Sequence, residues 1–260
     1  MTVIVTTCLR PNTVLEDRAL QISEQLKLQY IEREKVSIDK LHEKLQASIL
    51  VVGKNRLEYF PIGYQEPIFF HPSSAMFRVK RLVREEKDPL IEVCKLEKGD
   101  SFLDCTLGLC SDSIVAAYHV GEKGHVVGLE VNQILSHIVK TGLKTWDTTY
   151  SPLLDALNRI EVINTSFHEY LSNLPDQSFD CVYFDPMFEH TIEESESMRK
   201  WERLADYSTI DERVVREACR VAKKRVVLKA HYRSHWFEEF GFTRLPRKSA
   251  KFHFGFIEKK

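Results

Sequence analysis

From Ser101 onward, short apolar runs typical of strands alternate with amphipathic patterns typical of helices, and this alternation restricts the fold more than any other feature of the sequence. The predicted strands are Ser101–Cys105, His125–Glu130, Ile160–Asn164, Phe179–Asp185 and Arg225–Lys229. The predicted helices between them are Ser111–Val120, Asn132–Leu143, Phe167–Asn173 and Asp211–Ala222. Strands that alternate with helices form parallel sheets, so the pattern predicts a doubly wound α/β fold with helices on both faces.

The segments on either side of this alternation differ from it. Phe242–Leu245 and Lys251–Glu258 follow one another without a helical pattern between them, which predicts a C-terminal antiparallel hairpin. Residues 1–85 predict a small N-terminal α/β module that ends in a basic connecting helix, and residues 86–260 form the larger domain. The elements expected in the module are a strand at Thr2–Thr6, helices after Asn12 and Ser37, strands at Ser48–Gly53 and Arg56–Phe60, and the basic helix at Ser74–Glu86.

Composition excludes several classes of protein. The 37 basic and 38 acidic side chains give a net charge of -1, so any RNA partner must be held by a local basic patch. No run reaches the ~18 apolar residues of a membrane span, and no signal peptide is recognisable, so we expect a cytoplasmic protein. The six cysteines include no Cys-x-x-Cys pair, which predicts buried thiols rather than metal ligands.

The turn after the first strand of the larger domain is the first candidate binding element. It runs from Asp104 to Asp112, and Gly108 lets its backbone approach a ligand closely. Glu130 ends the next strand, where an acidic residue binds the hydroxyls of a ribose in related folds. The chain has neither a Gly-x-Gly-x-x-Gly nor a P-loop motif, which counts against nicotinamide, flavin and nucleotide-hydrolysing sites. Alternatively, Gly108 simply ends a strand.

The turn after the fourth strand carries the second candidate element, Asp185-Pro186-Met187-Phe188. It resembles the Asp/Asn-Pro-Pro-Tyr/Phe signature of enzymes that methylate exocyclic amines of nucleobases. Asp185 and the Pro186 carbonyl could each accept one amine hydrogen, which would aim the nitrogen lone pair at a methyl donor. Phe188 would stack on the base, worth ~1–3 kcal/mol. The alternative is that Asp-Pro ends a buried strand and Phe188 covers the core.

Together these segments resemble a known family, the RsmJ type of 16S ribosomal RNA (guanine-N2) methyltransferases. The matching residues are Asp104–Asp112, Glu130, Asn164–Ser166, Tyr183–Phe188 and Lys224–Lys229. The resemblance implies a Rossmann-like class I methyltransferase sheet, S-adenosylmethionine (SAM) as cofactor, and ribosomal RNA or the small ribosomal subunit as partner. It implies no DNA partner and no metal.

The resemblance also assigns residues to roles. Asp104, Gly108, Ser111 and Asp112 would form the turn at the methionine end of SAM, and Asp185 would lie between cofactor and target amine. Glu130 and Val131 would face the ribose and adenine, and Thr165 and Ser166 would border the adenine. The family's Gly-Arg before the turn aspartate is Cys110-Ser111 here.

Basic side chains supply the candidate substrate contacts. Lys229 ends the fifth strand, where its charge would position a phosphate or a base, and Phe188, Arg78 and Arg81 are the other expected contacts. Two basic groups either grip phosphates or are solvated faces: Arg78, Lys80, Arg81 and Arg84, and Arg244, Arg247, Lys248 and Lys251.

Two alternatives to an RNA methyltransferase stay open at this point. The near-neutral charge and the acidic run from Glu193 to Glu196 favour a small molecule or a protein as the methyl acceptor. A non-catalytic module that binds SAM or RNA is the second. The oligomeric state is not indicated by the sequence.

Overall fold

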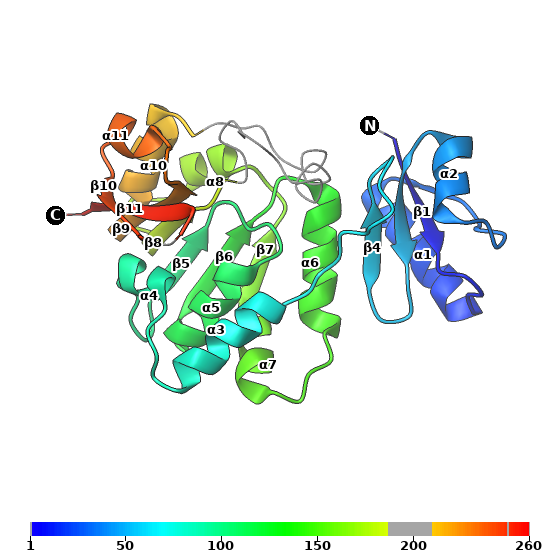
Figure 1. Cartoon of the computed structure of the whole chain (residues 1–260), viewed down its shortest axis with the longest axis horizontal. Coiled ribbons are helices and arrows are strands. Elements are labelled where there is room, and N and C mark those ends of the chain that lie inside the picture. The colour runs from blue at the N-terminus through cyan, green and yellow to red at the C-terminus, as the bar shows by residue number, and fades with distance from the viewer. Residues whose placement is uncertain (1, 187–209, 249, 260) are drawn as a thin grey trace. The chain divides into compact units, whose positions relative to one another are not determined.

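The computed structural model describes residues 2–186, 210–248 and 250–259, and its contacts divide the chain into two compact units (Figure 1). Among these residues, unit 1 holds 2–71 and 133–147, and unit 2 holds the rest. The division falls after His71, ahead of the basic helix after which the sequence predicts the domain boundary. No helix in the described ranges combines the length and the apolar character that crossing a membrane requires.

Unit 1 is a small α/β module, as the sequence predicts. Its sheet has the strand order β2-β1-β3-β4, in which β1 pairs in parallel with β2 and β3, and β4 is antiparallel to β3. Its helices begin at caps that the sequence contains, because Asn12 and Ser37 accept backbone N–H groups of the first turns. The elements are β1 (Val3–Thr7), α1 (Thr13–Leu26), β2 (Gln29–Tyr30), α2 (Ile38–Leu45), β3 (Ser48–Val52), β4 (Leu57–Phe60) and α6 (Gln133–Thr145).

Helix α6 belongs to unit 1 although it follows a strand of unit 2 in the chain. It contacts β4, and Gly142 on α6 faces the ring of Phe70. A Cβ atom at position 142 would lie 2.3 Å from Phe70 Cγ, so only glycine allows this approach. Trp146 meets Phe70 edge to face at 6.1 Å between ring centroids and completes the contact.

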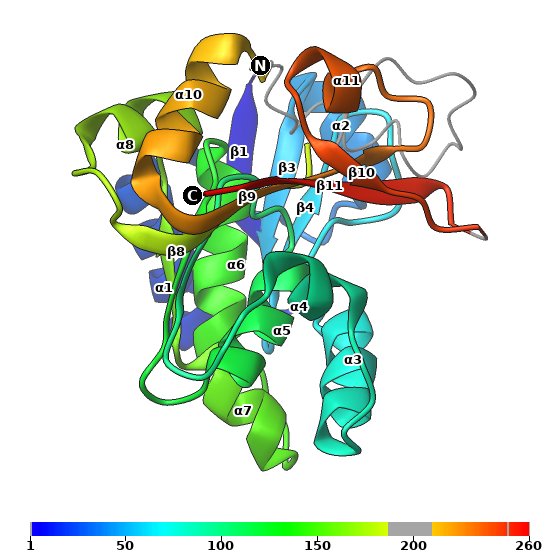
Figure 2. The same cartoon turned by 90° about the vertical axis from the view of Figure 1, so that its left-hand side faces the viewer.

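Unit 2 is built on a 7-stranded sheet with the order β10-β11-β9-β8-β5-β6-β7 (Figures 1 and 2). Strands β5 to β9 are parallel to one another, and β11 is antiparallel to β9 and to β10, which confirms the mostly parallel sheet with antiparallel C-terminal pairing. The elements are α3 (Ser73–Val83), α4 (Pro89–Cys94), β5 (Ser101–Asp104), α5 (Ser111–Val120), β6 (His125–Leu129), α7 (Ser151–Leu157), β7 (Ile160–Ile163), α8 (Phe167–Asn173), β8 (Phe179–Phe184), α10 (Glu212–Val221), β9 (Ala222–His231), α11 (Trp236–Glu239), β10 (Thr243–Leu245) and β11 (Phe252–Glu258).

Both faces of this sheet are covered, which explains why its strands are apolar on both sides. Helices α4 and α5 contact one face, and α8 and α10 contact the other. The core of the second face contains Leu103, Val182 and Leu228 from three neighbouring strands together with Val214 and Ala218 of α10. Strand β5 lies between β8 and β6, so the order of strands reverses on either side of it, and a ligand site is expected at its carboxyl end.

Close packing on β11 gives a test of the fold. Gly255 lies opposite Leu228 in the register, and a Cβ atom there would lie 2.6 Å from Phe237 Cδ1 and 3.0 Å from Phe242 Cβ. We expect Gly255→Ala to lower the free energy of unfolding by about 1–3 kcal/mol, because both buried rings must shift. Urea unfolding measures this, with the exposed Thr243→Ala as control; equal stability of the two variants would contradict the packing described.

Candidate active site

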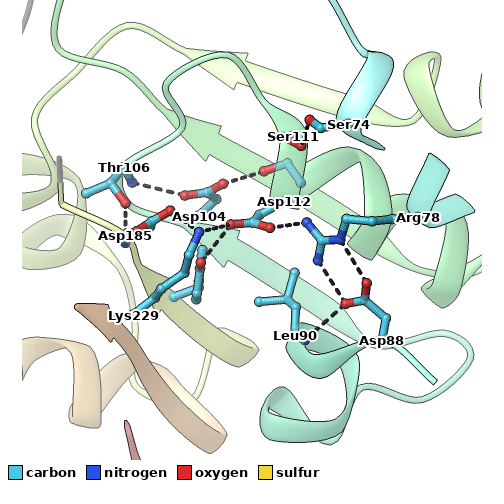
Figure 3. Close-up of polar contacts among 12 residues, drawn as sticks. Ser74, Arg78, Asp88, Leu90, Asp104, Thr106, Ser111, Asp112, Asp185 and Lys229 are labelled. Atoms are coloured by element: carbon cyan, nitrogen blue, oxygen red, sulfur yellow. Dashed lines mark hydrogen bonds and ion pairs between the residues drawn. The ribbon is translucent and has the colours of Figure 1, made fainter. Parts of the chain in front are cut away.

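The candidate site lies at the carboxyl ends of the parallel strands of unit 2, where four elements bring charged side chains together (Figure 3). Asp104 ends β5, Asp185 follows β8, and Lys229 lies near the end of β9. Asp112 comes from the first turn of α5, which packs on this sheet. Asp104 and Asp112 belong to one segment, Asp185 and Lys229 come from distant parts of the sequence, and the strand order brings all four to one edge.

Asp104 organises the turn that follows β5. Its Oδ1 accepts the backbone N–H of Thr106 at 3.1 Å, and its Oδ2 accepts the Ser113 hydroxyl at 2.6 Å. The side chain is buried, and this burial raises the pKa of Asp104 to about 7. Gly108 has φ +51, a left-handed conformation that favours glycine. Asp104 and Gly108 therefore shape the turn, and both carboxylate oxygens of Asp104 are bonded within it.

Asp112 is the most heavily bonded carboxylate of the site. It accepts the Tyr183 hydroxyl at 2.7 Å and the Lys229 ammonium at 3.3 Å, and it forms an ion pair with Arg78. Burial alone would raise its pKa, but Lys229 and Arg78 outweigh burial and lower the pKa of Asp112 to about 2. Asp112 is consequently a fixed negative charge at neutral pH.

Asp185 is held at both its backbone and its side chain. Its N–H donates to the Thr106 hydroxyl at 2.6 Å, and its Oδ2 accepts the Lys229 ammonium at 2.6 Å. Burial and the nearby Asp112 raise the pKa of Asp185 to about 6, although Lys229 acts in the opposite direction. Pro186 follows and fixes the backbone direction at the strand end. Met187 and Phe188 lie outside the described residues.

Arg78 connects the site to helices α3 and α4. Its Nε and Nη2 donate to the two oxygens of Asp88 at 2.8 Å each, and Nη1 donates to Asp112. Asp88 in turn caps α4 by accepting the N–H of Leu90 at 3.0 Å. A contact with an RNA phosphate would require Arg78 to leave both carboxylates. By contrast, Arg81 is exposed and pairs only with Glu86 among the described residues.

Helix α3 reaches the site at a second point. The Ser74 and Ser111 hydroxyls lie 2.8 Å apart, and Ser111 opens helix α5 directly before Asp112. The conformation of this helix start is set by Cys110, whose φ of +70 turns the chain into α5. Ser111 thus lies beside the fixed charge of Asp112.

The turn after β6 holds the second candidate group. The Glu130 Oε1 accepts the N–H of Asn132 at 2.9 Å. Asn164, at the end of β7, donates its amide to the carbonyls of Glu130 and Val131 at 2.8 and 2.9 Å. Val131 is 40% exposed and leaves an apolar surface beside an acidic group.

Thr165 and Ser166 follow Asn164 and begin helix α8. The Ser166 hydroxyl accepts the N–H of Glu169 at 3.2 Å, and the Thr165 hydroxyl donates to the Glu169 carboxylate at 3.1 Å. These contacts are those of a helix cap, so both residues are positioned by α8. Their expected place beside an adenine stays a prediction.

Several residues of the site had no role assigned from the sequence. Thr106 bonds Asp104 and Asp185, Tyr183 bonds Asp112, Asp88 holds Arg78, and Asn164 holds the turn of Glu130. For Tyr183 a signal exists, because a tyrosine within an apolar strand needs a partner for its hydroxyl. Within the described ranges, no group of three or more His, Cys, Asp or Glu residues could hold a metal ion.

The residues present fit SAM on chemical grounds. The ionised Asp112 suits an ammonium group, Glu130 suits the hydroxyls of a ribose, and the exposed Val131 suits the face of an adenine. The turn around Gly108 lets the backbone approach such a ligand. These groups lie at the ends of the adjacent strands β5 and β6.

Comparisons with known proteins agree with this chemistry. The model of a family described as "Putative SAM-dependent methyltransferase" matches residues 24–252. The uncharacterized protein YpiP of Bacillus subtilis is 44% identical over 255 residues, which cover 98% of this chain and 99% of that protein. A ribosomal RNA small subunit methyltransferase J of Francisella tularensis subsp. novicida is 39% identical over 90 residues, so the match covers 34% of each chain.

A solved structure supports the fold. A SAM-dependent methyltransferase from Neisseria gonorrhoeae aligns over 98% of this chain and 95% of its own, with a TM-score of 0.62 and 17% identity. At this identity the likeness concerns the arrangement of helices and strands.

The ion pairs of Arg78 give a test of the site's framework. We expect Arg78→Met to lower the free energy of unfolding by about 3 kcal/mol, because it leaves the buried Asp88 without its guanidinium partner and removes one of the two cations that pair with Asp112. Arg81→Met, on the same helix, removes an exposed pair and should cost no more than about 1 kcal/mol. Chemical denaturation compares the two; a similar loss in both variants would show that Arg78 does not hold the framework.

Proposed function

Since this chain belongs to the SAM-dependent methyltransferase family, we propose that it transfers a methyl group to the exocyclic N2 amine of a guanine in ribosomal RNA. The protein is a class I SAM-dependent methyltransferase, and SAM is its cofactor. The choice of acceptor goes further than the family. It is supported by the Asp185-Pro186 turn and by the partial match to a ribosomal RNA methyltransferase.

SAM supplies an electrophilic methyl group on a sulfonium centre. In this proposal Asp112 and Ser111 hold the methionine end of the cofactor, and Glu130 with Val131 holds the ribose and adenine. Arg78, Tyr183 and Lys229 hold the Asp112 carboxylate in one position, and the ammonium group of the cofactor would share its oxygens with them. Asp104 and Gly108 would act indirectly, because they shape the turn that carries Ser111 and Asp112.

The observation that carries the proposal is the Asp185 carboxylate, held by Lys229 at the strand end beside Asp112. Lys229 occupies Oδ2, and no donor within the described ranges contacts Oδ1. Oδ1 can therefore accept one hydrogen of an amine, while the Pro186 carbonyl accepts the other. An aryl amine held by both hydrogens presents its lone pair in one direction, which is the orientation that methyl transfer needs.

The raised pKa of Asp185 would help it to accept the proton that the amine loses after methyl transfer. An amine nitrogen that has gained a methyl group must lose one hydrogen as a proton. A carboxylate with a pKa near 6 accepts that proton more readily than an ordinary aspartate. Asp185 would thus orient the amine first and take its proton afterwards.

Ribosomal RNA or the small subunit is the proposed partner, with Phe188 stacking on the target base and Arg81 meeting a phosphate. Arg81 is exposed, and its surface pair with Glu86 is weak enough to exchange for a phosphate. The family relationship alone also allows a small-molecule or protein acceptor. The experiments below distinguish these acceptors from RNA.

Two substitutions separate the roles of the strand ends. We expect Asp185→Ala to abolish methyl transfer and to weaken SAM binding only modestly, because it removes the group that holds the amine. Glu130→Ala should do the reverse, with weaker SAM binding as its main effect. Radiolabelled methyl incorporation and calorimetry measure the two properties. Turnover of Asp185→Ala at the wild-type rate would remove Asp185 from the mechanism.

The acceptor is tested by mass spectrometry of nucleosides from ribosomal RNA of cells with and without this protein. We expect one N2-methylguanosine to disappear when the protein is absent and to return with the wild-type protein but not with Asp185→Ala. Identical nucleoside profiles would refute the RNA proposal. Methyl incorporation into a ribonuclease-resistant acceptor would then favour the small-molecule or protein alternative.

The ion pair between Lys229 and Asp185 predicts a pH effect. Activity requires ionised Asp185, so kcat/KM should rise with pH through about 6. Removing a neighbouring cation raises a carboxyl pKa, so Lys229→Met should move this rise to higher pH, whereas Lys229→Arg should keep it near the wild-type position. Profiles from pH 5 to 9 measure it. A higher KM with an unmoved acid limb would instead support a phosphate contact for Lys229.

A further inference from the structure

A second surface of unit 2 combines exposed aromatic rings with basic side chains. We call it the hairpin patch, and it consists of Tyr232, Arg233, Arg247, Lys248, Lys251 and Phe252. Tyr232 is 37% exposed and Phe252 is 42% exposed, although large aromatic side chains are usually buried. The patch lies where β9 ends and where the link between β10 and β11 turns, beside helix α11 (Figure 2).

The aromatic rings of the patch are fixed by their neighbours. His231 contacts both, with centroid distances of 4.5 Å to Tyr232 and 6.0 Å to Phe252. The Tyr232 N–H donates to the Lys251 carbonyl at 2.8 Å, which ties the end of β9 to the start of β11. Both rings therefore stand in set positions on the surface, and a ligand that stacks on them does not have to order them first.

The patch continues the edge that carries the candidate active site. In the register of β9 and β11, Lys229 lies opposite Phe254 and His231 lies opposite Phe252. Alternate residues of a strand share a face, so Lys229, His231 and Phe252 lie on one face of the sheet. Tyr232 lies in the turn directly after β9, three residues from Lys229, and its ring lies 6.1 Å from that of His253 between centroids. Since Lys229 bonds Asp185, the patch begins next to the catalytic turn.

The charge of the patch is available to a ligand. Arg233, Arg247, Lys248 and Lys251 form no ion pair with any residue in the described part of the chain. Arg233 lies 5.2 Å from the centroid of the Tyr232 ring, so a cation adjoins a stacking surface.

The nearby acidic groups are already engaged. Glu238 pairs with Arg244 at 3.5 Å, and Glu239 lies 3.0 Å from His235. The four cations of the patch therefore meet no opposing charge from α11.

We propose that the hairpin patch binds the single-stranded RNA that flanks the target nucleotide. Bases stack on Tyr232 and Phe252, and the basic side chains contact the phosphates between them. This inference rests on the proposed function, because it assumes that the acceptor is RNA. It also explains how a chain with a net charge of -1 binds a polyanion, since the positive charge is concentrated beside the site. An acidic peptide would satisfy the cations but would leave the two rings without a matching partner.

The binding test uses fluorescence anisotropy of the full-length protein with a labelled single-stranded RNA of mixed sequence. We expect Tyr232→Ala/Phe252→Ala to weaken RNA binding at least about fivefold, and Tyr232→Phe/Phe252→Tyr to restore it. Arg233→Ala/Arg247→Ala should reduce the slope of log K against log salt by about 1.4 if each arginine contacts one phosphate. Arg213→Ala/Arg216→Ala removes two exposed arginines from α10 and is the matched control.

Measurements of SAM affinity and of methyl incorporation into ribosomal RNA, on the same variants, separate the possible outcomes. Loss of RNA affinity in the patch variants, with SAM affinity and the α10 control unchanged, supports the inference. Wild-type RNA affinity in the patch variants overturns it, even where the protein methylates RNA. Binding of anionic lipid vesicles but not of RNA also overturns it. If the wild type methylates no RNA, the proposed function fails, and patch-dependent RNA binding would still stand as a separate result.

Discussion

The structure of the site depends on one partly buried negative charge, the carboxylate of Asp112. Three donors from three elements converge on it: Arg78 of α3, Tyr183 of β8 and Lys229 of β9. A buried charge is costly unless it is fully paired, so this cluster fixes where α3, α5 and the two strands meet. Lys229 then extends the network to Asp185, and through Thr106 the network returns to the turn after β5.

The same network gives the three carboxylates different properties. Asp112 is paired with cations and stays ionised, whereas Asp104 is buried with neutral hydrogen-bond donors and holds a proton more readily. Asp185 lies between these cases, with burial and Lys229 acting in opposite directions. Environment, rather than residue type, therefore gives three aspartates at one edge of a sheet three different pKa values.

Local patterns predicted most of the fold, because the alternation of strands with helices and the caps of helices depend on residues that are close in sequence. Ser111–Val120 and Phe167–Asn173 match the observed helices at both ends. The short elements β2, α7 and α11 were missed, since two to seven residues carry little periodicity. The contacts of Arg78 could not be predicted, because Asp88 and Asp112 meet it only through the packing of α3 on α5. The motifs singled out Asp185 and Glu130 as candidates, whereas the ion pair of Asp185 with Lys229 of β9 forms only in the folded sheet.

Helix α6 has a consequence for how the chain is made. It lies between β6 and β7 in the sequence, yet it packs against β4 and Phe70 of the module that begins at the N-terminus. During synthesis the contacts of α6 with this module cannot form until about residue 147 has left the ribosome, by which time β5 and β6 have already emerged. Segments of the two units are thus synthesised in alternation, and cleavage of the polypeptide at one position cannot separate the two complete units.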